Sequence, residues 1–138
     1  METTGVDIGN VRALRRLRVL VAARDRRFLR VAGFLLARRG FDVESTGRPR
    51  DVLEIVDRRP PDIVILDGSG SLAEAARSVA VLEALCPHVT VVVVSEETPP
   101  PPSANLRVFP KWTSFEQLAV NLEAMHLGVL STRPASGS

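Results

Sequence analysis

Runs of apolar residues alternate with amphipathic stretches along most of this chain. Three runs, at 18–23, 63–66 and 89–94, are apolar on nearly every position and rich in β-branched residues. Such runs are typical of strands buried on both faces, as in a parallel sheet covered by helices. Residues 41–45 alternate apolar and polar positions, which predicts a more exposed strand at or near a sheet edge, and residues 107–110 predict a short fifth strand.

Apolar residues recur at helical spacing between these strands. The first helical pattern follows Asp25 and stops at Gly40, a residue type favoured just after a helix end. The second starts at Pro49, which suits a first helical turn, and runs to Arg59. The third covers residues 71–85, so strands and helices alternate regularly along the chain.

Four consecutive prolines at 99–102 interrupt the pattern between the fourth and fifth strands. Proline removes backbone donors and favours extended geometry, so we expect residues 97–105 to be extended or irregular, with the usual helix lost. A last helix is predicted after Thr113 to Glu116, which have the spacing of a capping box, and Gly128 is expected to end it.

The alternation predicts an α/β fold of the flavodoxin-like class. We expect a three-layer sandwich with a five-stranded parallel sheet in the order 2-1-3-4-5, whose crevice lies between strands one and three. The chain is long enough for a single hydrophobic core. It is divided into a basic N-terminal arm at 1–17, a domain at 18–128 and a flexible tail at 129–138.

Composition excludes several classes of protein. The single cysteine, Cys86, rules out a disulfide framework within the chain and fits a reducing, cytoplasmic setting. The apolar run at 89–94 is too short to span a membrane, so we expect a soluble protein with no membrane partner. His88 and His126 stand alone in the sequence pattern, which argues against metal binding or general-base chemistry at either.

Charge is divided unevenly along the chain. Residues 1–59 hold fourteen arginines and eight acidic residues, whereas residues 60–138 hold four basic and eight acidic residues. A basic half can attract nucleic acid or an acidic partner, but scattered arginines are more often a solvated surface. Since the chain has no tyrosine and no aromatic residues interleaved with the arginines, nucleic-acid binding is not expected.

Candidate site residues lie at the ends of four of the predicted strands: Ala23-Arg24-Asp25, Asp67, Ser95 and Lys111. Carboxyl ends of parallel strands meet at one edge of a sheet, so we expect these residues to gather there. Asp67 and Lys111 could be no more than a structural ion pair, and Ser95 a hydroxyl that bonds the backbone. The glycines and serine at 68–70 lack the spacing and lysine of a phosphate-binding P-loop, and they are interpreted as a turn.

With these residues in place, the chain from Arg18 to Gly128 resembles the receiver domain of bacterial two-component response regulators. Asp67 matches the family's phosphoacceptor aspartate, Ser95 its Ser/Thr after strand four, and Lys111 its lysine after strand five. The resemblance implies signal transduction of the phosphorelay type, with Ser95 and Lys111 contacting a phosphoryl group.

The chain departs from that family where receivers hold Mg²⁺. The acidic pair at the end of strand one aligns with Ala23 and Arg24, so we expect no cofactor, no Mg²⁺ site and no efficient phosphorylation of Asp67. Asp25 lies one residue too far along and is expected to cap the first helix. Arg24 could turn inward and pair with Asp67, or point to solvent and leave Asp67 to Lys111.

Further departures lie on the side that receivers use for output. Glu96 replaces a small residue, Val108 stands at the aromatic switch position, and Trp112 replaces the proline after Lys111. A cis peptide bond without proline costs roughly 2.5–4 kcal/mol, so the bond before Trp112 is expected to be trans. Trp112 would then be free to pack against the last helix or a partner.

The sequence thus predicts a stand-alone, pseudo-receiver-like domain that is not an enzyme. We expect it to act through protein–protein interaction with signalling partners, such as a histidine kinase or an output protein, or as a homodimer. Two alternatives stay open: a small-ligand binding domain that uses the crevice between strands one and three, and an arginine-rich nucleic-acid-binding protein.

Overall fold

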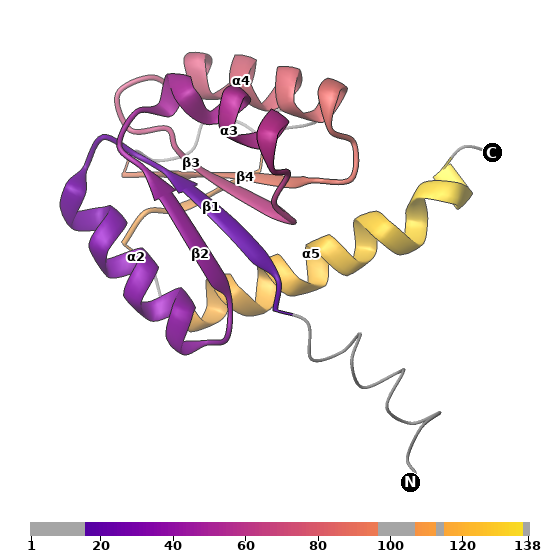
Figure 1. Cartoon of the computed structure of the whole chain (residues 1–138), viewed down its shortest axis with the longest axis horizontal. Coiled ribbons are helices and arrows are strands. Elements are labelled where there is room, and N and C mark those ends of the chain that lie inside the picture. Colours follow the sequence, from indigo (N-terminus) through magenta and orange to yellow (C-terminus); the bar gives the residue numbers. More distant parts are fainter. Residues whose placement is uncertain (1–15, 97–106, 113–114, 137–138) are drawn as a thin grey trace, which may run out of the picture.

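The computed structural model describes residues 16–96, 107–112 and 115–136, and within them five parallel strands form one sheet (Figure 1). The strand order is β2-β1-β3-β4-β5, which confirms the predicted flavodoxin-like order. The strands are β1 (Arg18–Ala22), β2 (Asp42–Thr46), β3 (Ile63–Asp67), β4 (Thr90–Ser95) and β5 (Val108–Pro110). The expectation for residues 97–105, and most of the predicted N-terminal arm, lie outside the described residues.

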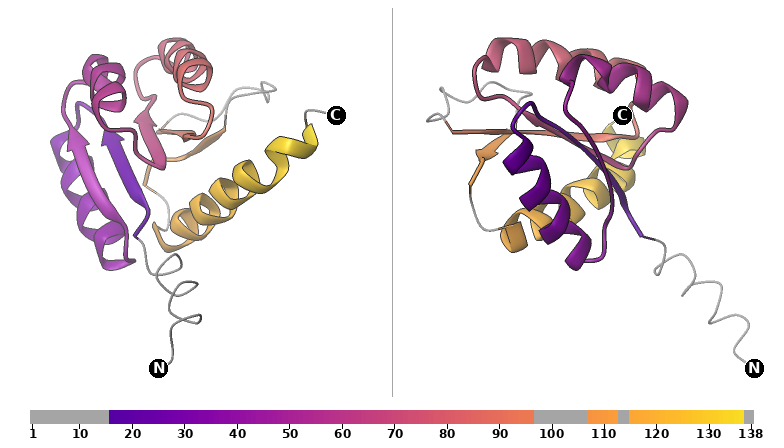
Figure 2. Two further views of the ribbon diagram at one scale, coloured as in Figure 1. Left: turned by 45° about the vertical axis from the view of Figure 1, so that its right-hand side comes forward. Right: turned by 60° about the vertical axis from the view of Figure 1, so that its left-hand side comes forward.

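Helices cover both faces of the sheet and make a three-layer sandwich (Figure 2). α2 and α5 pack against one face, and α3 and α4 pack against the other. A 3₁₀ turn, η1, leads into α3. The elements are α2 (Arg26–Arg38), η1 (Pro49–Asp51), α3 (Val52–Arg58), α4 (Leu72–Leu85) and α5 (Phe115–Ser136).

The inner strands divide their side chains between two cores. In β1, Val19 and Val21 join the core under α2 and α5, whereas Leu20 and Ala22 join the core under α3 and α4. Successive side chains of a strand point to opposite faces, so a strand that is apolar throughout serves both cores. β2 is an edge strand with no fully buried residue, as its alternating pattern predicted.

Capping residues determine where α2 and α4 start, at the carboxyl edge of the sheet. The Asp25 side chain accepts a hydrogen bond of 3.1 Å from the backbone N–H of Phe28, which confirms its role as the cap of α2. Ser71 caps α4 in the same way through the N–H of Glu74. Gly40 has φ +105°, a conformation that favours glycine, and chain direction changes there after α2.

The predicted end of the last helix is wrong. α5 continues past Gly128 to Ser136, so most of the segment expected to be a flexible tail is helical. An isolated glycine costs a helix only about 1 kcal/mol relative to alanine, and it ends a helix only where capping geometry accompanies it. The last turns of α5 extend beyond the sheet in Figure 1. None of the helices in the described ranges combines the length and apolarity of a membrane span.

Candidate functional site

Three charged side chains meet at the carboxyl edge of the sheet. The Nζ atom of Lys111, just after β5, lies 2.8 Å from Oδ2 of Asp67 and 2.9 Å from Oδ2 of Asp25. The side chains of Lys111 and Asp67 are 3% and 7% exposed, while that of Asp25 is 34% exposed. The structure therefore brings Asp67 and Lys111 together and adds Asp25, which the sequence pattern assigned only to capping.

Hydrogen bonds within this group favour the charged forms of Lys111 and Asp25. Burial disfavours the Lys111 ammonium, but the hydrogen bonds to Asp67 and Asp25 outweigh it and raise the pKa of Lys111. The hydrogen bond from Lys111, followed by the one from the Phe28 N–H, lowers the pKa of Asp25. The edge of the sheet thus holds a charged triad, defined as Asp25, Asp67 and Lys111.

The second oxygen of Asp67 is also engaged. Oδ1 accepts a hydrogen bond of 2.9 Å from the backbone N–H of Ser69, so Asp67 closes an Asx-type turn at the start of the loop. Gly70 has φ +99°, and the predicted turn at 68–70 is confirmed. A Cβ atom on Gly68 would lie 2.7 Å from Cγ1 of Val93, so only glycine fits this close approach.

Backbone hydrogen bonds tie the loops of the site to the neighbouring strands. The N–H of Gly68 donates to the carbonyl of Val94 at 2.7 Å, and the N–H of Lys111 donates to the carbonyl of Ser95 at 2.9 Å. Ser95 is buried as the last residue of β4, opposite Pro110. The hydrogen bond to Ser95 therefore holds the backbone of Lys111 against β4, and this places its side chain beside the carboxylates.

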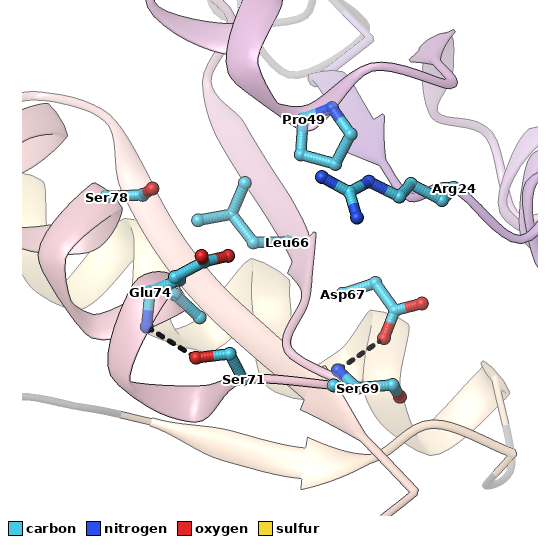
Figure 3. A pocket seen from close by; sticks show the side chains of 10 residues that line it. Arg24, Pro49, Leu66, Asp67, Ser69, Ser71, Glu74 and Ser78 are labelled. Carbon is cyan, nitrogen blue, oxygen red and sulfur yellow. Dashed lines mark hydrogen bonds between the residues drawn. The ribbon is translucent and has the colours of Figure 1, made fainter.

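Arg24 does not turn toward Asp67, so the predicted ion pair between them is not formed. Its side chain is exposed, and within the described residues it forms no ion pair with Asp67 or any other carboxylate. It lines a cavity beside Asp67, with its guanidinium group turned toward Pro49 and Leu66 (Figure 3). The charge partner of Asp67 is Lys111.

The residues present do not fit a magnesium ion. Mg²⁺ needs oxygen ligands, and the fully buried Ala23 offers no side-chain oxygen while Arg24 adds a positive charge. The carboxylates of Asp25 and Asp67 already share the Lys111 ammonium. No group of three metal-binding side chains exists within the parts of the chain that the structure describes.

Trp112 packs against α2, and its predicted contact with the last helix stays a prediction. Its ring meets that of Phe28 edge-on, with 5.5 Å between the ring centroids, and Arg27 lies over it at 5.3 Å. Its Nε1–H donates to Oε2 of Glu96 at 3.0 Å. The peptide bond before Trp112 is trans, as predicted. Since 43% of Trp112 is exposed, part of it also remains available to a partner.

His126 is not isolated, contrary to the expectation from its sequence surroundings. It is buried on α5, its Nδ1 lies 3.0 Å from Oγ1 of Thr90, and its Nε2 lies 3.9 Å from Oδ1 of Asp62. These contacts join residues far apart in the chain at the end of the sheet opposite the charged triad. His88 is exposed, and Cys86 is a partly buried free thiol beside the core under α4.

No family model matches the sequence, and no curated protein matches it either. Solved structures do match. A CheY-like response regulator receiver domain from Methanospirillum hungatei superposes with a TM-score of 0.71 at 13% identity, covering 85% of this chain and 98% of that one. The chain has the receiver-domain fold.

Two further receiver structures agree with it. A response regulator from Thermotoga maritima gives a TM-score of 0.68 at 15% identity, covering 81% of this chain and 98% of that one. The receiver domain of the hybrid histidine kinase CckA gives 0.63 at 18% identity, covering 78% and 96%. At such identities the likeness shows the receiver fold, and the site's chemistry has to be argued from its own residues.

Proposed function

We propose that this chain is a degenerate receiver domain, which transmits signals through protein–protein contacts without enzymatic activity and without efficient phosphorylation of Asp67. The receiver fold supports the signalling role. The observation that carries the proposal is at the end of β1, where the fully buried Ala23 and the cationic Arg24 stand in place of the acidic pair that would hold a metal ion.

Phosphoryl transfer to a carboxylate brings two negatively charged groups together, and a metal ion ordinarily neutralises that charge and orients the oxygens. Neither Ala23 nor Arg24 supplies a ligand for such an ion. Both oxygens of Asp67 are already bonded, Oδ1 to the N–H of Ser69 and Oδ2 to Lys111. Ser69 and Lys111 therefore hold the carboxylate in one arrangement, while Ala23 and Arg24 offer no ligand for an exchangeable cation.

The partners of such a domain are signalling proteins, for example a histidine kinase or an output protein, or a second copy of the chain. Partly exposed Trp112 next to the triad supports a contact at this edge, since aromatic residues are enriched where proteins bind each other. Its contacts with Phe28 and Glu96 link α2 to the loops after β4 and β5. A partner on Trp112 would thus sense the arrangement of the triad.

Intact-mass spectrometry after incubation with Mg²⁺ and acetyl phosphate tests the proposal. The expected result is an unchanged mass. The matched variant is Ala23→Asp with Arg24→Asp, which restores the acidic pair and should gain one phosphoryl group that disappears when Asp67→Asn is added. A phosphoryl group on the unaltered chain, lost in Asp67→Asn, would contradict the proposal.

One observation favours the small-ligand alternative as an additional function. A cavity lies beside the ends of β1 and β3, between η1 and α4, and Arg24 and Asp67 line it.

A further inference from the structure

The cavity measures about 340 Å³ and lies between the end of β3, the first turns of α4 and the segment that leads into α3 (Figure 3). Small side chains on one face of α4 leave this space: Ser71, Ala75 and Ser78 follow at helical spacing. Leu66 and Pro49 provide apolar wall. Small-molecule sites commonly measure roughly 300–1,000 Å³, so the space suits a compact ligand.

Two opposite charges face this space from different elements. Arg24 reaches in from the end of β1, and Glu74 reaches in from α4, both toward Leu66 (Figure 3). Neither forms an ion pair within the described residues. Asp67 also lines the cavity, but its charge is matched by Lys111. The unmatched charges of the wall are therefore one cation and one anion.

We propose that this cavity binds a compact zwitterion of the amino-acid class. The planar guanidinium group of Arg24 suits a carboxylate, which it can bind through two hydrogen bonds. Glu74 suits the ammonium group, and the Ser78 hydroxyl offers a further hydrogen-bonding group nearby. An anion without an amine would leave Glu74 unmatched, and an apolar ligand would leave both charges unmatched.

This inference goes beyond the proposed signalling role and does not depend on it. The groups that carry it, Arg24 and Glu74, take no part in the charged triad. Binding would give the domain a chemical input at the loop after β3, because the cavity is lined by Asp67 of the triad and by Ser69, whose N–H donates to Asp67.

Amide ¹H–¹⁵N spectra of the full chain, recorded with each of the twenty common amino acids at millimolar concentration, test the inference. At least one amino acid should shift the signals of residues 69–78 saturably. Arg24→Gln and Glu74→Gln should each weaken binding by about tenfold or more, as expected for the loss of a charge-assisted hydrogen bond. Ser78→Leu, at an exposed position, should abolish binding by filling the cavity.

Arg30→Gln and Glu83→Gln are the matched controls, because both residues are exposed on α2 and α4 and neither lines the cavity. They should leave the dissociation constant unchanged. The N-acetylated form of the bound amino acid, which lacks the ammonium group, should bind about tenfold more weakly or worse. Absence of any saturable shift would overturn the inference. So would equal binding of the N-acetylated form, or tighter binding of inorganic phosphate than of every amino acid.

Discussion

Lys111 is the cation that the structure places against the carboxylate of Asp67. A buried ammonium between two carboxylates offsets one of their two negative charges and contacts both groups. Because this cation belongs to a side chain, it cannot be replaced by an ion from solution. Removing Lys111 should therefore leave the two carboxylates facing each other without a cation between them.

Lys111→Met should lower the free energy of unfolding by about 3 kcal/mol, the lower end of the range for breaking a buried ion pair, since the sheet edge can admit water. The substitution leaves the Asp67 carboxylate buried without its cation. Urea denaturation measures the loss. Adding Asp67→Asn should restore most of it, and a double variant as unstable as Lys111→Met alone would contradict the ion-pair explanation.

Alkaline unfolding should report on Lys111 selectively. Its pKa is raised in the folded state above the ordinary 10.5, so its stabilisation is complete below pH 10.5 and is lost as pH rises through the folded-state pKa. The chain has no tyrosine and no other lysine. Urea midpoints in a Cys86→Ala background, which removes the only thiol, should fall above pH 10.5. In the additional presence of Lys111→Met this fall should be largely absent.

At the scale of elements, glycines show where the fold is tight and where it is not. Gly68 joins β3 to α4 where a Cβ would lie within 2.8 Å of both Val93 and Leu72 side-chain atoms. Gly33 lies in the middle of α2, where a Cβ would meet nothing within 4 Å. The same substitution should therefore have opposite effects at the two positions.

Gly68→Ala should destabilise the protein by about 1–3 kcal/mol through overpacking. Gly33→Ala should stabilise it by about 0.5–1 kcal/mol, because alanine restricts the unfolded chain and favours a helix. Thermal and urea denaturation of the two variants measure both effects. A destabilising effect of Gly33→Ala would contradict the prediction, because it would mean that the space around Gly33 is not open.

A buried hydrogen bond connects α5 to the sheet. Nδ1 of His126 lies 3.0 Å from the hydroxyl of Thr90, the first residue of β4. Thr90→Val should cost about 1–3 kcal/mol, because a buried polar group loses its partner. Thr90→Ser keeps the oxygen and should cost less. Urea denaturation compares the two, and equal losses would show that packing of the Thr90 methyl group dominates.

At the scale of the whole molecule, the sheet was largely predictable because its inner strands are apolar on both faces. The strand order followed from five strands with crossover connections. Lys111 and Asp67 could be placed at one edge by topology alone. The second contact of Lys111, with Asp25, could not be foreseen, because it depends on where Asp25, the third residue after β1, directs its capping side chain.

Other features needed three-dimensional information for different reasons. Arg24 had two plausible orientations that differ by side-chain rotation only. The continuation of α5 past Gly128 contradicts a weak local stop signal, and the contact between His126 and Thr90 joins residues 36 positions apart. Cavities arise from side chains that are small on neighbouring elements, a property no single stretch of sequence displays.

Because Lys111 is the only lysine in the sequence and only 4% exposed, the folded chain shields its single side-chain amine from amine-reactive reagents. Acylation of Lys111 can then proceed only while the triad is open. Its rate relative to that in the urea-unfolded chain, followed by peptide mass spectrometry, becomes a direct kinetic measure of how often the triad opens. Acetylation of Lys111 by acetic anhydride would thus report how any partner, ligand or substitution changes the opening of this edge.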